Sequence, residues 1–443
     1  MLLGGGCVVR RGRSGVAALV AICPPAMCVP LSAHAEDSKG PPASPSIASS
    51  LPANGDPFGT RASLAALGVT FGINYIGEGF DVVRGGRSRG TTFDGRAEFY
   101  SDADMEKIAG WKGATFHVNV FGLHGVGPTT KRVGSIGPVT GVEALETVRL
   151  YEIWFEQALL DGKLKIRFGQ MSADAEFWLS DAASLFLNGT FGWPAINAAN
   201  MPQGGPAYPF ATPGVRVQFS PNDNVTILAA VFNSLPASPN AADPQRDNRY
   251  GTNFRISDPP LAMLEGHFKY DLGLPGKLRL GGWREFNDFT DQRTGAIIDG
   301  NYGLYAIVDQ QIWKGGEHQR VSVFGRVAGG ADKQNVMTSY FDTGIVFGGL
   351  VPGRAKDSFG ADFGYGRISS QARAGDLDAG KAVIRDYEAV VELNYRAEIV
   401  PGWTVAPDFQ YIWHPGGHVE DPGHPGAAVA DAVVIGARTA INY

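Results

Sequence analysis

The sequence predicts an all-β fold, a transmembrane antiparallel β-barrel with short turns at one end and long loops at the other. Three observations lead to this prediction. Apolar and polar residues alternate in several runs, tight turns alternate with long polar stretches, and the last run ends on the aromatic residue Tyr443. Alternation with a period of two is typical of strands with one apolar face. Alternating turn and loop lengths are typical of outer-membrane barrels, which have periplasmic turns and extracellular loops.

The composition excludes several other classes of protein. Aromatic residues make up 11% of the chain and the net charge is only −6, which is unlike a disordered chain. No run of about 18 apolar residues occurs, which excludes a helical membrane protein. The negative net charge argues against nucleic acid as a partner. The 60 glycines in 443 residues are about twice the average usage and indicate many turns.

The first 35 residues have the three parts of a secretory signal peptide. Arg10, Arg11 and Arg13 precede an apolar stretch at 16–23, and a small-residue cleavage site follows at 33–35. A short buried helix is the alternative, and the arginine cluster and the cleavage site argue against it. All three cysteines lie in this leader, so the mature chain is expected to contain no disulfide.

We expect three segments along the chain. Residues 1–35 form the signal peptide, 36–58 form a flexible segment rich in Pro, Ser and Ala, and 59–443 form the barrel. A short helical pattern occupies 61–67 at the start of the barrel segment. Export of a barrel through a cleavable signal peptide places the protein in the outer membrane of a Gram-negative cell.

The predicted strands carry apolar residues at every second position. Leu164, Ile166 and Phe168, for example, alternate with Lys163, Lys165 and Arg167. Similar runs lie at 69–75, 114–120, 215–220, 387–396 and 433–443. Tight turns are expected at 161–162, 221–224, 274–276 and 400–402. Long loops are expected at 125–145, 186–212, 233–260, 328–342 and 414–431.

A soluble sandwich and a membrane barrel both fit the alternation, and the barrel fits the other observations better. Long charged side chains, such as Arg216, Arg279 and Arg326, suit a face that meets water, although the exterior of a sandwich is also charged. The signal peptide, the turn and loop lengths and the C-terminal strand favour the barrel. Roughly 14 to 18 spanning strands of about 9–11 residues fit the chain and would enclose an aqueous channel.

Several short blocks stand in a characteristic order and spacing, among them Asp104-Met-Glu-Lys-Ile-Ala-Gly-Trp-Lys-Gly113, Tyr151-Glu-Ile-Trp-Phe-Glu-Gln157 and His414-Pro-Gly-Gly417. Further blocks lie at 55–61, 161–170, 281–283, 309–310, 324–326, 344–354 and 407–412. Through these blocks the sequence resembles the carbohydrate-selective porins of the OprB type, from about residue 55 to residue 443. It departs from them near 57–58, where a Trp is replaced, and at Tyr443, where Phe is commoner.

The resemblance implies a barrel of about 16 strands and passive diffusion of glucose and related sugars or polyols. It also implies a constriction lined by Arg, acidic and aromatic side chains. Arg donates hydrogen bonds to sugar hydroxyls, carboxylates accept them, and an aromatic ring can stack on the sugar. The expected partners are the permeating solutes, outer-membrane lipid and lipopolysaccharide, and the barrel assembly machinery. The oligomeric state is left open between a monomer and a homotrimer.

Seven residues are candidates for the constriction: Trp154, Glu156, Arg167, Trp283, Arg326, Arg354 and Asp357. Each has a plainer interpretation. An arginine on the polar face can simply keep the lumen wall wet and balance acids. A tryptophan can belong to the interfacial aromatic girdle. Arg354 and Asp357 can form a structural ion pair in a loop.

No metal site and no cofactor are expected. His414, His418 and His424 stand near Glu420 and Asp421, but their irregular spacing is more typical of a loop than of a metal site. No Gly-x-Ser-x-Gly nucleophile motif occurs, and an enzyme is not expected. Two alternatives to a porin stay open, namely an outer-membrane barrel enzyme and a sugar-binding surface protein without channel activity.

Overall fold

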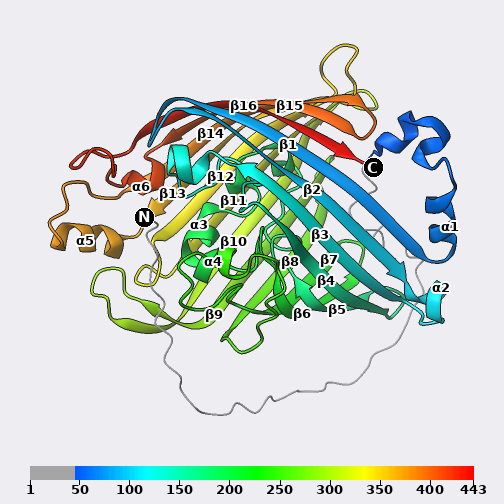
Figure 1. Cartoon of the computed structure of the whole chain (residues 1–443), viewed down its shortest axis with the longest axis horizontal. Helices are drawn as coiled ribbons and strands as arrows, with labels where there is room; N and C mark the ends of the chain where they lie inside the picture. The colour runs from blue at the N-terminus through cyan, green and yellow to red at the C-terminus, as the bar shows by residue number, and fades with distance from the viewer. Residues whose placement is uncertain (1–44) are drawn as a thin grey trace.

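The alternating runs form sixteen antiparallel strands that close into one barrel, with each strand paired to its neighbours in sequence and β16 paired to β1 (Figure 1). The computed structural model describes residues 45–443. The predicted antiparallel barrel and the strand number of about sixteen are confirmed. The strands are β1 Val69–Gly86, β2 Gly90–Asp104, β3 Ala114–Val126, β4 Thr147–Leu159, β5 Leu164–Met171, β6 Thr212–Asn222, β7 Val225–Asn233, β8 Pro260–Asp271, β9 Pro275–Thr290, β10 Ile297–Lys314, β11 Arg320–Gly330, β12 Met337–Gly348, β13 Ser358–Ile368, β14 Tyr387–Val400, β15 Trp403–Trp413 and β16 Ala430–Asn442.

Short helices lie outside or between the strands. The α-helices are α1 Thr60–Ala66, α2 Met105–Ala109, α3 Ala195–Asn200, α4 Pro244–Asp247, α5 Ser370–Asp378 and α6 Pro415–His418. The remaining short helices are η1 Ile47–Ser50, η2 Pro52–Gly55, η3 Thr129–Val133, η4 Ala183–Leu185, η5 Gly189–Phe191 and η6 Pro202–Gly204. The predicted helical pattern at 61–67 corresponds to α1. The predicted signal peptide lies outside the described residues, and the predicted flexible segment is described only from residue 45 onward.

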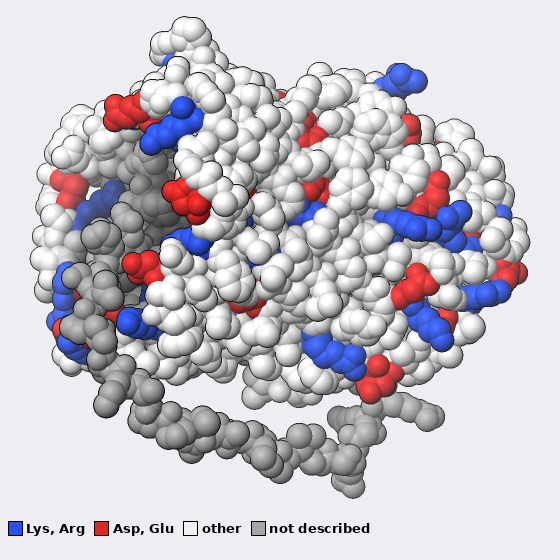
Figure 2. Space-filling view, turned by 180° about the vertical axis from the view of Figure 1, so that it is seen from behind, with Lys and Arg blue, Asp and Glu red and all other residues white. Residues whose placement is uncertain are grey.

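The two faces of the strands differ as the alternation predicts. On β5 the side chain of Phe168 is 52% exposed on the outer wall, whereas Lys165 is buried on the inner face. Figure 2 shows that the charged side chains of one face gather mostly toward the two ends of the barrel, with a mainly uncharged wall between them. Within residues 45–443, none of the helices has the length and apolar character needed to cross a membrane.

The barrel has a turn end and a loop end. The four predicted tight turns all lie at the turn end, together with α1, α2 and the C-terminal Tyr443, whereas α5 and α6 lie at the loop end (Figure 1). Three loop boundaries differ from the prediction. The loop predicted at 186–212 spans 172–211, the loop predicted at 328–342 spans only 331–336, and the loop at 369–386 was not predicted.

These differences have physical reasons. Residues 172–186 contain the apolar residues Phe177 and Trp178, so this part of the loop does not stand out as a polar stretch, and both side chains pack inside the barrel. The first residues of β12 mix polar and apolar types, so they were included in the predicted loop. Met337 and Tyr340 among them point into an apolar part of the interior. The loop at 369–386 contains α5, whose periodicity differs from that of a strand.

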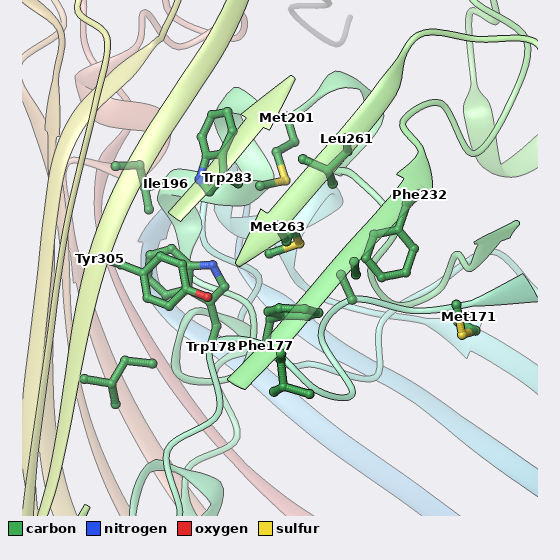
Figure 3. Packing of buried hydrophobic residues seen from close by; sticks show 14 of the residues in the cluster. Met171, Phe177, Trp178, Ile196, Met201, Phe232, Leu261, Met263, Trp283 and Tyr305 are labelled. Atoms are coloured by element: carbon green, nitrogen blue, oxygen red, sulfur yellow. The ribbon is translucent and has the colours of Figure 1, made fainter. Parts of the chain in front are cut away.

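Two loops fold into the barrel and create a hydrophobic core there. The β5–β6 loop, residues 172–211, carries Phe177, Trp178, Ile196 and Met201 into one cluster with side chains of β7 to β10. Figure 3 shows this cluster, with Trp178 lying against Tyr305 of β10 at a ring distance of 3.7 Å. The β3–β4 loop, residues 127–146, contributes Val133 and Val139 to a second cluster. The lumen is therefore narrowed by packed loops.

Candidate functional site

The β5–β6 loop is held across the lumen by carboxylates of the barrel wall. The backbone N–H of Trp178 donates to Glu265 Oε2 at 3.0 Å. Further along, the N–H groups of Leu187 and Asn188 donate to the two oxygens of Glu392 at 2.6 and 2.8 Å. Backbone polar groups that leave water need such partners, and here the wall supplies them. The strands β8 and β14 thus act as anchors for the loop.

Arg326 of β11 also anchors the β5–β6 loop, but as a cation that donates hydrogen bonds to loop carbonyls. Its guanidinium group forms an ion pair with Asp342 at 2.6 Å, and both side chains are fully buried. The remaining N–H groups donate to the carbonyl oxygens of Trp178, Thr190 and Gly192 at 3.3, 2.9 and 3.1 Å. All three carbonyls belong to the β5–β6 loop. Arg326 therefore fixes the loop and does not face the open part of the lumen.

The β3–β4 loop is anchored on the neighbouring part of the wall. The backbone N–H groups of Ile136 and Gly137 each donate to Glu388 of β14 at 2.7 Å. The hydroxyl of Thr140 donates to Glu78 of β1 at 2.5 Å. Buried carboxylates on the lumen face thus again accept hydrogen bonds from the backbone or side chains of a loop.

A stacked column of side chains crosses four neighbouring strands on the other side of the lumen. Tyr100 of β2, His117 of β3, Trp154 of β4 and Arg167 of β5 follow one another. The centroids of the first two ring pairs are 6.4 and 4.5 Å apart, and the Arg167 guanidinium carbon lies 3.7 Å from the centroid of Trp154. His117 Nδ1 lies 2.8 Å from a carboxylate oxygen of Asp102. Both faces of the Trp154 ring are therefore occupied by protein.

Arg167 ends this column in a four-membered charge cluster. Arg167 and Arg216 stand directly opposite each other on β5 and β6. Glu156 of β4 accepts from Arg167 at 2.9 Å and from Arg216 at 2.8 Å. Glu176, which belongs to the β5–β6 loop, contacts the same two arginines at 2.7 and 2.5 Å. Two positive and two negative groups balance, and the loop is joined to the wall at this point.

The pKa of Glu176 depends on two opposing effects, its burial and its pairing with the two arginines. Burial acts to raise the pKa, and attraction to Arg167 and Arg216 acts to lower it. The attraction exceeds the burial effect, so the pKa of Glu176 lies below its ordinary value of 4.5. Glu176 is therefore ionised at neutral pH and keeps both arginines paired.

A second polar group lies on β2 and β3, next to the column. Glu98 contacts Arg96 at 3.4 Å and accepts from the amide of Asn119 at 2.7 Å. The Arg96 guanidinium also lies over the rings of Phe121 and Tyr208, at 4.7 and 5.5 Å. Arg96 Nε and Asn119 Oδ1 have no protein hydrogen-bond partner among residues 45–443. Both atoms are buried, so the solvent-facing part of this group consists of the other polar atoms of Arg96 and Glu98.

The structure brings together only some of the predicted site residues. Trp154, Glu156 and Arg167 form one cluster on β4 and β5. Arg326 lies under the β5–β6 loop. Trp283 is 6% exposed inside the hydrophobic cluster of Figure 3, which is not the position of an interfacial girdle residue.

Arg354 and Asp357 lie apart from this cluster. They form a 2.7 Å ion pair in the β12–β13 turn, at the turn end of the barrel. The hydroxyl of Tyr395 also donates to Asp357. The plainer interpretation of a local ion pair therefore describes the geometry of Arg354 and Asp357.

Sequence reasoning missed five residues of this region: Arg96, Glu98, Asn119, Glu176 and Arg216. Asn119 and Arg216 stood on predicted polar faces, so their inward direction was readable from the alternation. Glu176 was not, because nothing in the local pattern shows that residues 172–211 fold back into the barrel. The sequence does carry one indication of it. Arg167 and Arg216 face each other on neighbouring strands and need acidic partners, which can come from a loop.

Comparisons with known proteins agree with this architecture. The model of the family described as carbohydrate-selective porin, OprB family, matches residues 88–443. Porin B of Pseudomonas aeruginosa is 24% identical over 409 residues, which cover 82% of this chain and 87% of that protein. A putative porin QuiX of Acinetobacter baylyi is 23% identical and covers 88% of this chain and 92% of its own length. The high-pH structure of Pseudomonas putida OprB superposes with a TM-score of 0.76 at 21% identity, covering 88% of this chain and 97% of that one.

Proposed function

Since the chain belongs to the OprB family of carbohydrate-selective porins, which are channels of the outer membrane, we propose that glucose-sized sugars and polyols diffuse passively along the polar wall formed by β2 to β5. The observation that carries this proposal is the charge cluster of Arg167, Arg216, Glu156 and Glu176 on the inner side of the barrel, in which Arg167, Glu156 and Glu176 keep 15–19% of their side-chain surface exposed. Arg96, Glu98 and Asn119 continue the same polar wall toward β2.

The chemistry of this wall suits a neutral solute with many hydroxyl groups. Guanidinium N–H groups donate in a fixed fork, and carboxylates accept. The two arginines and two glutamates of the cluster cancel in charge, so the cluster gives no strong attraction to an anion or a cation. Each hydroxyl exchanges water for a comparable protein partner, which makes binding weak and release fast, as conduction requires.

We assign Trp154 a supporting role. The sequence suggested that a tryptophan could stack on the sugar ring, but His117 and Arg167 cover both of its faces. A cation over an indole face is held by the ring quadrupole, most strongly where water is excluded. Trp154 therefore orients Arg167, and Arg167 meets the solute.

Glucose inhibition of single-channel current tests this assignment. In Arg167→Gln the side chain can still donate a hydrogen bond but has lost its charge and its fork. We expect glucose to inhibit the current with an affinity about tenfold weaker, because a hydrogen bond to a charged group contributes roughly 1.5–3 kcal/mol. Arg354→Gln is the matched control, since it removes an arginine from the turn end and should leave inhibition unchanged.

Two outcomes would contradict the proposal. One is a natively folded protein that gives no current in a planar bilayer. The other is equal inhibition by glucose in the wild type and in Arg167→Gln. Liposome swelling with glucose, gluconate, sorbitol and sucrose then ranks the solutes, and native mass measurement in detergent distinguishes a monomer from a homotrimer.

A further inference from the structure

Two histidines of the β15–β16 loop converge on one aspartate at the loop end of the barrel. His414 follows β15 directly, His418 ends α6, and Asp386 immediately precedes β14 (Figure 1). His414 Nδ1 lies 2.8 Å from Asp386 Oδ1, and His418 Nδ1 lies 3.8 Å from Asp386 Oδ2. One donor atom from each of the three residues lies within 4.8 Å of the other two.

We propose that Asp386, His414 and His418 form a binding site for a divalent transition-metal ion of the Zn²⁺ type. Imidazole nitrogens and a carboxylate oxygen are ligands that Zn²⁺ prefers, at about 2.0–2.2 Å. In a tetrahedral site such bonds place the donors about 3.3 Å apart, so small side-chain rotations would complete the set. Three protein ligands leave one coordination position for water. The ion would tie the β15–β16 loop to the end of the β13–β14 loop.

The backbone of this loop is built to hold the two imidazoles together. His414 and His418 have φ angles of 48° and 69°, in the left-handed region that residues other than glycine seldom adopt. Gly416 and Gly417 between them are also left-handed. Such strain persists only where surrounding contacts enforce it, and it is concentrated at functional sites.

Those contacts are visible around the turn. The N–H of His414 donates to Asp431 at 3.0 Å, and the N–H of Gly416 donates to Glu388 at 2.7 Å. The N–H of Asp386 donates to the carbonyl of Gly417 at 3.0 Å, which joins the carboxylate to the same turn. The two imidazole rings stack at a distance of 4.3 Å and an angle of 17°.

The electrostatic surroundings favour a cation. Asp431, which accepts from the N–H of His414, adds negative charge beside the cluster. Arg385, the cation nearest to Asp386 in sequence, is paired with Asp376 at 2.7 Å instead. The three side chains of the cluster are 26–34% exposed, so an ion from the medium can reach them.

His424 of the same loop provides an internal comparison. It contacts Asp421 at 2.8 Å, but its side chain is 80% exposed, and neither residue belongs to a three-donor cluster within the described part of the chain. A single exposed pair should bind the ion only weakly. The sequence pattern around 414–424 treats all three histidines alike, and only the fold separates them.

Calorimetric titration of the chelator-treated, folded protein with Zn²⁺ tests the site. His414→Asn and His418→Asn remove an imidazole, and Asn tolerates the left-handed backbone. We expect one Zn²⁺ per chain in the wild type and in His424→Asn. Both cluster variants should bind at least about 100-fold more weakly, because changes outside the ligand set alone cost about 10–100-fold.

Co²⁺ spectroscopy of the wild type and of Asp386→Asn keeps the test independent of how the histidine variants fold. Bound Co²⁺ should give the absorption bands of a four-coordinate site in the wild type and lose them in Asp386→Asn. The proposal is overturned if the wild type binds Zn²⁺ no more tightly than the cluster variants. It is also overturned if His424→Asn loses binding to the same extent, or if wild-type Co²⁺ bands are absent.

Discussion

The two sides of the lumen wall carry the same residue types but use them differently. On β8 to β15 five charged and polar side chains of the inner face are completely covered, with an exposed fraction of 0% for Glu265, Arg326, Asp342, Glu392 and Gln410. On β2 to β5 four charged side chains of the inner face keep 14–21% of their surface exposed, namely Arg96, Glu98, Glu156 and Arg167. The β5–β6 and β3–β4 loops account for this difference, because they cover the first side and leave the second partly open.

The comparison shows that charge on a lumen-facing strand does not by itself identify a solute contact. A loop folded into a barrel buries backbone N–H and C=O groups, and each of these needs a partner. Glu392 supplies acceptors for two loop N–H groups, and Arg326 supplies donors for three loop carbonyls. The covered side is therefore a structural support, and the open side is the one for which we propose contact with the solute.

The largest effect is expected from removing the central support. Arg326→Ala leaves Asp342 buried without its ion pair, which should lower the free energy of unfolding by about 3–5 kcal/mol. Freed from three hydrogen bonds, the β5–β6 loop should move, so the single-channel conductance should rise and inhibition by glucose should weaken. Urea unfolding and bilayer recording measure the two effects.

Arg320→Ala is the matched control for that variant, since Arg320 begins the same strand and its side chain is exposed at the turn end. It should change neither stability nor conductance appreciably. A double variant, Arg326→Met with Asp342→Asn, removes both charges and should recover part of the lost stability. Normal conductance in Arg326→Ala would show that the covered side does not hold the loop in place.

A smaller effect is expected from a glycine on the open side. Gly169 of β5 has φ 139°, and a Cβ there would lie 2.3 Å from the carbonyl oxygen of Ile153 and 2.6 Å from the Cα of Trp154. Gly169→Ala should therefore push β4 and β5 apart beneath the Trp154–Arg167 contact, at a cost of about 1–3 kcal/mol. Glucose inhibition should weaken while the conductance changes little.

Gly162→Ala separates backbone strain from the steric effect. Gly162 also has a positive φ, of 85°, but a Cβ at this position meets nothing within 4 Å. Its unfolding free energy should fall slightly and its glucose inhibition should stay at the wild-type value. If both variants weaken glucose inhibition equally, the stacked column is not what orients Arg167.

The sequence predicted the wall well and the loops poorly, for physical reasons. Alternation follows from the pleat of each strand, so the inward direction of Arg167 and the outward direction of Phe168 are readable from their neighbours. Whether an inward residue is open or covered depends on loops far away in sequence. Arg326 and Trp283 were therefore predicted at the constriction, although the β5–β6 loop lies over both.

The subtlest difference lies within the β5–β6 loop itself, where two acids two residues apart respond oppositely to pH. Burial raises the pKa of Asp174 to about 6, although the N–H of Tyr208 donates to it. The pKa of Glu176 is instead lowered below 4.5, because its two arginines overcome the effect of burial. Asp174 faces no cation in ion-pair contact among the described residues, and Glu176 faces two.

These opposite shifts predict opposite slopes in stability against pH. For Glu176 the folded pKa is the lower one, so its stabilisation is complete above 4.5 and is lost as the pH falls through the folded value. For Asp174 the folded pKa is the higher one, so the wild type should lose stability relative to Asp174→Asn as the pH rises from 3.8 to about 6. Unfolding of the wild type, Glu176→Gln and Asp174→Asn between pH 3 and pH 7 measures both slopes. The stability of the wild type relative to Glu176→Gln should rise with pH, and its stability relative to Asp174→Asn should fall. If both differences change in the same direction, the arginine pair does not hold Glu176 ionised, and some other contact joins the loop to the open wall.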